Sequence, residues 1–536
     1  MNSLAAQTVA GEPAAGATTG GLIDLILFRV ATSFHREALR WEGRALSYGQ
    51  LADRARAVAF QLSKLGVGRG DKVGILFPNE PDFVACFLAA SGLGATVVPV
   101  NPLLKSEEIA HILADSEARC LIVHERAIGE AARAVACVPA LRHVVVKRAG
   151  GASPPARRVG PAAPAGAASF HELTDLAAPP GTVAWPVPVE PDSDLALIVY
   201  TSGTTGKPKG AMLTHANMTY ALEVAEAAFR VQPHDRFLGV LPLCHIYGMT
   251  AVMLGALAGG GTLVIVEKFE AEVVLDLLER ERITVLPVVP AMYQFMLMAM
   301  EERRYDLSSV RVCVSGASSL PVEIFTKIEQ SFGAPLIEGY GATEVSCIAT
   351  FNRPDGVRKI GSVGLPFEGM ELAIVDESGA HLPAGPDNVG EIAIKGRNVM
   401  AGYYQQPQAT AESIRDGWFF TGDLGYKDED GFVYIVGRKK EMIIRGGQNI
   451  YPREIEEVIS RMKCVAEVAV IGVPDRLMGE RVKAVVVARP GAAVSEDDVK
   501  RHCAEHLAEY KVPRLVEFVP VLPRNSTGKV LKRLLS

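Results

Sequence analysis

The sequence predicts an α/β fold: a large N-terminal domain of stacked, mostly parallel sheets with helices and a β subdomain, then a small mobile α+β domain. Two observations lead to this prediction. Short Val- and Ile-rich runs alternate with helix-type periodicity through most of the chain, which is typical of parallel sheets covered on both faces. Near residue 436 the alternation gives way to two longer strand-like runs and one capped helix.

The alternation can be followed element by element. Ser47 and Gln50 form a capping-box pattern, and apolar residues continue at helical spacing as far as Leu65. A second helix-like run covers 81–94, and a third begins at Ser106. The strand-like runs are 72–77, 96–100, 120–123, 195–200, 237–241, 262–266, 285–289 and 311–314.

Two stretches interrupt this pattern, and a third follows it. Residues 1–20 have no basic start and no unbroken apolar core, which favours a mobile tail over a signal peptide. Residues 148–189, rich in Ala, Pro and Gly, are expected to form a long surface excursion. In the C-terminal part, strand-like runs at 465–471 and 482–487 precede a helix capped by Ser495. The predicted boundaries are a domain over 21–436, a hinge at 437–441 and a domain over 442–536.

Composition narrows the function classes. The net charge of −6 is spread over 536 residues without a basic block, so nucleic-acid binding is not expected. The eight cysteines contain no C-x-x-C pair, which argues against a disulfide framework or a cysteine zinc site and favours thiols in a reducing, cytoplasmic compartment. No spanning helix is expected. Peripheral membrane contact and homodimerisation stay open.

Residues 200–210 carry the most specific motif, YTSGTTGKPKG, at the end of a strand-like run. Glycines let backbone N–H groups approach an anion, hydroxyls donate hydrogen bonds, and lysines add positive charge. This composition favours a polyphosphate ligand over a plain polar turn. The motif is not a Walker A loop, because Pro208 follows the lysine. The residues expected at the phosphates are Thr201, Ser202, Gly203, Thr204, Thr205, Gly206 and Lys207.

The motif resembles the phosphate loop of adenylate-forming enzymes, the family of acyl- and aryl-CoA synthetases, adenylation domains and firefly luciferase. Further family motifs follow in order over roughly residues 25–530. The resemblance implies a carboxylate that attacks the α-phosphate of ATP, and then a thiol that attacks the acyl adenylate. It implies ATP, Mg²⁺ and coenzyme A as ligands. Adenylation would rest on positioning and electrostatics.

Two central motifs extend the resemblance. In PLCHIYGM at 242–249, His245 would line the carboxylate pocket and take part in catalysis. In EGYGATE at 338–344, Tyr340 would stack on adenine, Thr343 would bond phosphate, and Glu344 would bind Mg²⁺ together with Thr201. Other expected nucleotide contacts are Gly316, Ala317, Glu338, Gly339 and Gly341. The expected acyl pocket comprises His245, Tyr247, Gly248, Val288, Gly316, Gly341, Ser346 and Cys347.

Three motifs later in the chain complete the resemblance to adenylate-forming enzymes. WFFTGD at 418–423 would place Asp423 on ribose, and Arg438 would reach ribose or phosphate. Lys440 occupies the family's hinge position, and the resemblance implies that the C-terminal domain rotates about it between the two steps. Gly446 and Gly447 would line the coenzyme A tunnel. PRNSTGK at 523–529 ends in Lys529, the family's catalytic lysine of adenylation.

The expected acid follows from the character of the likely pocket segments. Segments 285–293 and 345–349 are largely apolar and lack an obvious cation, which favours a medium- or long-chain fatty acid. An aryl or other carboxylic acid is the alternative, as is an acyl-AMP ligase that loads a carrier protein. A regulatory nucleotide-binding module without catalysis is disfavoured, because Glu344 and Lys529 are both present.

Overall fold

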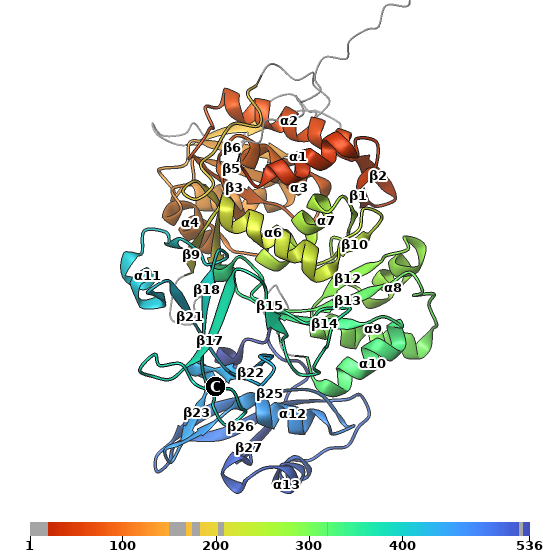
Figure 1. The fold of residues 1–536 in the computed structure, drawn as a ribbon, viewed down its shortest axis with the longest axis vertical. Coiled ribbons are helices and arrows are strands. Elements are labelled where there is room, and N and C mark those ends of the chain that lie inside the picture. Colours follow the sequence, from red (N-terminus) through yellow and green to blue (C-terminus); the bar gives the residue numbers. More distant parts are fainter. Residues whose placement is uncertain are drawn as a thin grey trace, which may run out of the picture. The chain divides into compact units, whose positions relative to one another are not determined.

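The computed structural model describes residues 20–148, 168–173, 183–201, 208–318, 320–524 and 529–535 (Figure 1). The chain divides into two compact units. Unit 1 comprises Met1–Glu226, Val231–Gly239 and Gly248–Glu267, and unit 2 comprises Ala227–Arg230, Val240–Tyr247 and Lys268–Ser536.

The main sheet of unit 1 has the strand order β9-β8-β4-β3-β5-β6-β7. Its neighbouring strands run parallel, except for the antiparallel pair β8–β9. Helices α2 and α3 pack on each other, as do α4 and α5. The strands are β3 (Lys72–Leu76), β4 (Thr96–Val100), β5 (Cys120–His124), β6 (His143–Lys147), β7 (Ser169–Glu172), β8 (Leu195–Thr201) and β9 (Lys209–Thr214), and the helices are α2 (Tyr48–Lys64), α3 (Pro81–Gly92), α4 (Ser106–Asp115) and α5 (Ile128–Val135).

A second group of strands in unit 1 has the order β10-β11-β1-β2. The pairs β10–β11 and β11–β1 are parallel, and β1–β2 is antiparallel. Helix α1 packs against α2 and α7. The bounds are β1 (Glu37–Trp41), β2 (Arg44–Ser47), β10 (Arg236–Gly239), β11 (Thr262–Ile265), α1 (Ile23–Thr32), α6 (His215–Phe229) and α7 (Gly255–Ala258), and a π-helix over Tyr247–Leu254 leads into α7.

Unit 2 begins with parallel strands β12, β13 and β14, which continue into antiparallel β15 and β16. A separate antiparallel sheet, β17-β18-β21-β20 with β22 on β21, forms the β subdomain. The strands are β12 (Val285–Val288), β13 (Val312–Ser315), β14 (Leu336–Tyr340), β15 (Thr350–Phe351), β16 (Leu365–Pro366), β17 (Met370–Val375), β18 (Gly390–Gly396), β19 (Gly402–Tyr403), β20 (Ile414–Arg415), β21 (Trp418–Lys427) and β22 (Val433–Arg438), and the helices are α8 (Ala271–Arg280), α9 (Pro290–Glu302), α10 (Val322–Phe332) and α11 (Pro407–Ser413).

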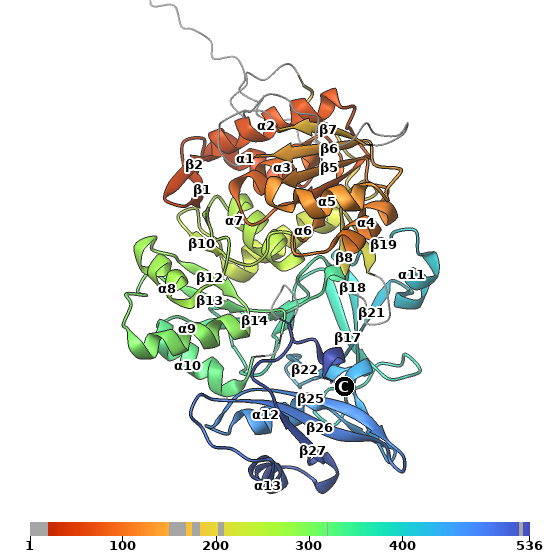
Figure 2. The same ribbon diagram turned by 180° about the vertical axis from the view of Figure 1, so that it is seen from behind.

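The C-terminal part of unit 2 is an α+β layer structure (Figure 2). Its sheet has the order β24-β23-β26-β25, with β27 parallel to β26. One face packs on α12 and α13, and the other packs on Leu522 and Leu535, which flank Lys529 in sequence. The segment that carries Lys529 is therefore anchored on the sheet. The bounds are β23 (Ile443–Arg445), β24 (Gln448–Ile450), β25 (Val465–Asp475), β26 (Gly479–Ala488), β27 (Leu515–Phe518), α12 (Pro452–Ser460) and α13 (Glu496–His506).

The predicted fold class is confirmed, and so are several local signals. Ser47 forms the predicted capping box with Gln50, and Ser495 caps its helix as predicted, in a capping box with Asp498. Within the predicted surface excursion at 148–189, Ser169–Glu172 form the mostly exposed edge strand β7, parallel to β6, which the sequence did not predict. That pairing depends on tertiary contact, which local composition does not report.

The remaining organisational predictions are untested. Most of the predicted tail, and much of 148–189, lie outside the described residues. The boundaries at 436 and 441 stay predictions. In the part of the chain that the structure describes, no helix combines the length and the apolar character that crossing a bilayer requires.

Candidate active site

The predicted phosphate loop connects two paired strands of unit 1. Tyr200 and Thr201 end β8, and Lys209 begins β9. The strands are antiparallel, with Thr201 opposite Lys209, so the motif begins and ends on two neighbouring strands. The Tyr200 hydroxyl donates to Asp115 Oδ2 at 2.6 Å, which anchors the end of β8. Residues 202–207, and with them the predicted roles of Ser202 through Lys207, lie outside the described residues.

Asp423 lies at the centre of a charged group in unit 2. It stands on β21 opposite Arg438 on β22, and Arg438 Nε lies 2.8 Å from its Oδ1. Its Oδ2 accepts a 2.6 Å hydrogen bond from the Tyr340 hydroxyl. Burial and the Asp423 charge together hold the pKa of Tyr340 well above its ordinary value, so its phenol stays a donor. Burial opposes ionisation of Arg438, but Asp423 raises the net pKa of this guanidinium.

Lys529 belongs to the same group. Burial lowers the pKa of Lys529, and the neighbouring Arg438 charge lowers it further, while Asp423 acts in the opposite direction. Three residues later, Lys532 forms ion pairs with Glu441 at 3.2 Å and Glu456 at 2.8 Å. Lys532 therefore ties the segment of Lys529 to the 439–441 turn and to α12. Lys532 carries no signal in the sequence, because a cation near a chain end is ordinarily solvated.

His245 is a neutral imidazole next to this group. Burial lowers the pKa of His245 to about 4, and the Lys529 charge adds to the effect. Its Nδ1 accepts a long hydrogen bond, 3.4 Å, from the Tyr247 backbone N–H. The remaining proton therefore lies on Nε2, which can donate to an anion such as a carboxylate. His245 lies in a turn rather than on a strand, since β10 ends at Gly239.

A triphosphate fits these residues by charge. Lys529 and Arg438 are neighbouring cations that are partly removed from water, so they repel each other. A bound anion would offset this repulsion. Glu344 lies in the 3₁₀ turn Thr343–Val345. Its carboxylate offers the oxygen ligands that Mg²⁺ prefers. Thr201 belongs to unit 1, and the magnesium site that would join it to Glu344 stays a prediction.

Tyr403 is a second residue that the sequence analysis missed. Its hydroxyl donates to Glu344 Oε1 at 3.0 Å, and the Met400 N–H donates to the Glu344 carbonyl at 2.9 Å. Burial and the Glu344 charge raise the pKa of Tyr403, which keeps it a donor. No pattern in the sequence around Tyr403 indicates a contact with Glu344, which lies 59 positions earlier in the chain.

The glycines at 339 and 341 have packing partners within unit 2. A Cβ on Gly339 would lie 2.1 Å from the Phe351 ring, and one on Gly341 would lie 1.8 Å from the Cys347 carbonyl oxygen. Close approach of the chain to itself thus explains both glycines. The predicted nucleotide contacts of both glycines, and the predicted place of Gly341 in the acyl pocket, stay untested. Nearby, Glu338 and Thr343 are buried, Gly316 follows β13, and Ala317 is exposed with φ +68°.

The predicted acyl-pocket residues of unit 2 differ in character. Val288, Ser346 and Cys347 are buried, and the Ser346 hydroxyl donates to the Asn398 carbonyl at 2.8 Å. Tyr247 is also buried, beside Gly316, whose added Cβ would lie 3.4 Å from the Tyr247 ring. The Tyr247 hydroxyl has no hydrogen-bond partner within the described chain. Gly248 is buried and belongs to unit 1.

The predicted hinge and tunnel residues lie on exposed turns. Lys440 stands in the 3₁₀ turn Lys439–Glu441. Gly446 and Gly447 form the two-residue turn between β23 and β24, with φ of +58° and +81°. Two positive φ values in a two-residue hairpin loop are the reason for two consecutive glycines. The predicted contacts of this turn with coenzyme A stay predictions.

The chain matches two family models. The model described as "AMP-binding enzyme" matches residues 28–404, and "AMP-binding enzyme C-terminal domain" matches residues 454–529. A long-chain-fatty-acid–CoA ligase from Bacillus subtilis is 35% identical, over 93% of this chain and 91% of the relative. A feruloyl-CoA synthase from an Amycolatopsis species is 38% identical, over 94% of this chain and 96% of the relative.

A solved structure agrees along nearly the whole chain. ATP-bound MatB from Rhodopseudomonas palustris aligns with a TM-score of 0.87 and 34% identity, over 97% of this chain and 98% of that one. The resemblance inferred from the motifs is thereby confirmed. The chain belongs to the AMP-binding, adenylate-forming enzyme family, the ligases that include the acyl-CoA synthetases.

Proposed function

We propose that this enzyme is an ATP-dependent acid–thiol ligase that forms an acyl adenylate and transfers the acyl group to coenzyme A. In the first step a carboxylate oxygen attacks the α-phosphorus of ATP, the bond to the β-phosphate oxygen breaks, and pyrophosphate leaves. In the second, the thiol sulfur attacks the acyl carbon, the acyl–phosphate bond breaks, and AMP leaves with its electron pair. The thiol proton passes to solvent.

The charged group around Asp423 is the observation that carries this proposal. Lys529 and Arg438 are cations that would stabilise the negative charge which develops on the phosphoryl oxygens during adenylation. Asp423 can accept bonds from ribose hydroxyls with lone pairs that Arg438 and Tyr340 leave unused. Neutral His245 would donate Nε2–H to the substrate carboxylate. Because the imidazole is uncharged, the carboxylate keeps the negative charge it needs to attack ATP. Mg²⁺ held by Glu344 and Thr201 would add countercharge at the phosphates.

Coenzyme A is the proposed acceptor because both curated relatives described above are named for coenzyme A thioesters. A carrier-protein thiol is the alternative acceptor. The two differ in an assay that offers only coenzyme A: a ligase for coenzyme A makes the thioester, whereas a carrier-loading enzyme stops at the adenylate.

We infer a medium- or long-chain fatty acid as substrate. The support is the apolar character of the pocket candidates: Val288 and Cys347 are buried, and the one hydroxyl among the residues at 346–349 is bonded to backbone. Burying each methylene of an acyl chain contributes about 0.8 kcal/mol, so an apolar slot favours longer chains.

Tyr247 favours a second candidate, an aryl acid with a polar ring substituent. Its hydroxyl is buried and lacks a partner among the described residues, which is costly by about 1–3 kcal/mol unless a ligand supplies the bond. A hydroxyl or methoxy group of the substrate would satisfy it. A plain fatty acid would not.

An acid panel decides between these candidates. Pyrophosphate release would be measured with C6–C16 fatty acids, cinnamic acids with and without ring hydroxyls, and malonate, each with and without coenzyme A. Mass spectrometry would identify the product. Highest turnover with C8–C16 acids supports the fatty acid, and highest turnover with hydroxycinnamates supports the aryl acid. Adenylate without thioester for every active acid would contradict coenzyme A as acceptor.

A further inference from the structure

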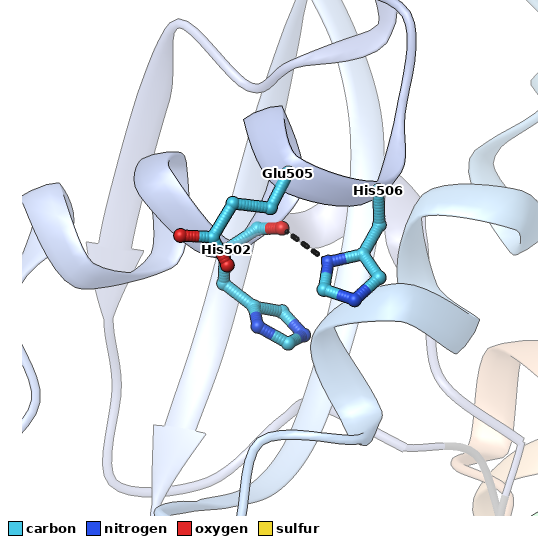
Figure 3. A group of neighbouring side chains, drawn as sticks. All are labelled: His502, Glu505 and His506. Carbon is cyan, nitrogen blue, oxygen red and sulfur yellow. Dashed lines mark hydrogen bonds between the residues drawn. The ribbon is translucent and has the colours of Figure 1, made fainter.

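Two histidines and one glutamate gather on α13, away in sequence from every motif of the active site. Figure 3 shows His502, Glu505 and His506 on this helix. Val499 and Cys503 of α13 are buried in the core, whereas His502 is half-buried and Glu505 and His506 are exposed. Positions 502 and 506 are one helical turn apart, so their rings share a face. The ring centroids are 4.6 Å apart.

Each imidazole has one nitrogen bonded to a backbone carbonyl. His502 Nε2 lies 3.1 Å from the Val458 carbonyl oxygen of α12. His506 Nδ1 lies 2.9 Å from the His502 carbonyl oxygen, the contact dashed in Figure 3. A carbonyl can only accept, so both of these nitrogens carry protons. In the neutral rings, His502 Nδ1 and His506 Nε2 therefore keep their lone pairs. Metal-binding histidines are typically oriented by a carbonyl or carboxylate on the second nitrogen in this way.

Glu505 supplies a third ligand atom. One atom from each of the three side chains lies within 4.8 Å of the others. A tetrahedral ion with ligands at about 2.0–2.2 Å needs them roughly 3.4 Å apart, and the exposed Glu505 side chain can rotate to close the difference. Glu496 and Asp498, by contrast, are occupied by ion pairs with Lys500 at 2.8 Å and with Arg501. Within the described chain, Glu505 has no such pair.

We propose that His502, Glu505 and His506 form a binding site for one divalent transition-metal ion, with water completing the coordination. Two imidazoles and one carboxylate suit Zn²⁺, Co²⁺, Ni²⁺ or Cu²⁺, and they disfavour Mg²⁺, which prefers oxygen ligands. The ion links two turns of α13. Because His502 is also bonded to Val458, the ion fixes the contact between α13 and α12. The site is independent of the proposed ligase activity.

Titration of the full-length, tag-free protein with Zn²⁺ and with Co²⁺ tests the site, since the readout is binding itself. Isothermal calorimetry should give one equivalent of Zn²⁺, no comparable heat with Mg²⁺, and an affinity at least tenfold lower in His506→Ala and in Glu505→Gln. Both side chains are exposed, so both variants should keep the fold. His234→Ala, which removes an exposed histidine elsewhere, should bind as the parent does.

Cobalt distinguishes this site from cysteine ligation. The described chain has one exposed thiol, Cys137, and Cys137→Ser should leave the isotherm unchanged. The Co²⁺ complex should show ligand-field bands without thiolate-to-metal charge transfer. Equal Zn²⁺ affinity in the parent and His506→Ala, a thiolate band in the cobalt spectrum, or the absence of saturable binding would each overturn the proposal.

Discussion

Asp423 and Arg438 face each other on the antiparallel strands β21 and β22, with 2.8 Å between Arg438 Nε and Asp423 Oδ1. The two residues are directly opposite each other in the strand register. The second carboxylate oxygen of Asp423 accepts a hydrogen bond from the Tyr340 hydroxyl. Tyr340 ends β14, so one carboxylate joins the parallel strands of unit 2 to its β subdomain. A structural role and the proposed ribose-binding role thus fall on the same side chain.

Replacing Asp423 with Asn should affect both roles. The amide keeps the shape but loses the charge that pairs with Arg438, so we expect adenylation to fall by about 10²-fold. Stability should fall by about 1–3 kcal/mol, less than for a fully buried pair because Arg438 is partly exposed. Pyrophosphate release and urea denaturation measure the two effects. Asp497→Asn, an exposed change on α13, is the control, and unchanged adenylation in Asp423→Asn would contradict the ribose role.

Lys529→Ala should separate the two half-reactions. We expect adenylation to fall by about 10²–10³-fold, because a preorganised cation is lost, while thioester formation from a preformed acyl adenylate stays within about threefold. Rapid-quench measurement of each half-reaction tests this. Lys532→Met removes the ion pairs to Glu441 and Glu456 but leaves Lys529 in place. It should therefore slow adenylation less than Lys529→Ala does. Equal losses in both half-reactions of Lys529→Ala would count against alternation of the C-terminal domain.

The pH profile of adenylation should reflect the environment of Lys529. Burial and Arg438 lower the pKa of its ammonium below the ordinary 10.5, and only the protonated form stabilises phosphoryl charge. The rate should therefore decline as pH rises through this lowered pKa. Lys529→Arg keeps its charge to much higher pH, so its decline should move to higher pH or vanish. Identical alkaline limbs in both proteins would assign the decline to another group.

Much of this architecture could be predicted from the sequence, because local signals agreed with the tertiary fold. Ser47 and Ser495 cap their helices through side-chain bonds to residues three positions later, a purely local interaction. Buried strands such as β3 and β5 are continuous Val/Ile/Leu-rich runs, which is how strands covered on both faces appear.

The parts that were missed depend on contacts between distant residues. Tyr403 and Glu344 are 59 positions apart, and neither residue's neighbours indicate the bond between them. Lys532 resembles a solvated tail residue until the fold places two carboxylates beside it. The packing of Gly339 against the Phe351 ring, 12 positions later, is likewise a contact that the residues around Gly339 do not indicate. The type of a residue limits the chemistry it can perform, but only the fold shows which side chains it contacts.

Gly447→Trp should impair thioester formation more than adenylation. An added Cβ at Gly447 meets nothing within 4 Å, so the penalty within the domain is mainly that of φ +81°. If coenzyme A passes this turn, thioester formation should fall at least tenfold while adenylation changes less than twofold. Gly491→Trp is a matched control, since Gly491 also has positive φ (+75°) and open space. Equal thioester formation in the two variants would remove the tunnel role.

Glu338 should make stability fall as pH rises through the neutral range. Burial raises the pKa of Glu338 from an ordinary 4.5 to about 7. Between these values the folded state binds a proton that the unfolded state does not, so its contribution to stability is present below about pH 4.5 and is lost as pH rises to 7. The free energy of unfolding of Glu338→Gln, relative to that of the parent, should therefore rise by on the order of 2 kcal/mol from pH 5 to pH 8. Thermal unfolding of both proteins at several pH values measures this difference, and a pH-independent difference would contradict it.

Tyr247→Phe should reveal which acid the pocket accepts. If a polar substituent of the substrate satisfies the buried hydroxyl, the variant should lose about tenfold in kcat/KM for that acid, since a hydrogen bond to a neutral group contributes about 1 ± 0.5 kcal/mol and a buried partner left unpaired costs more. For a plain fatty acid the hydroxyl has no bond to lose, so kcat/KM should hold or rise and stability should increase slightly. Phe keeps the ring that packs beside Gly316, which limits the change to the hydroxyl. The ratio of kcat/KM for hydroxycinnamate and decanoate, compared between parent and variant, cancels any general loss of activity. An unchanged ratio would show that neither acid contacts this hydroxyl and would remove the support that Tyr247 gives to the aryl candidate.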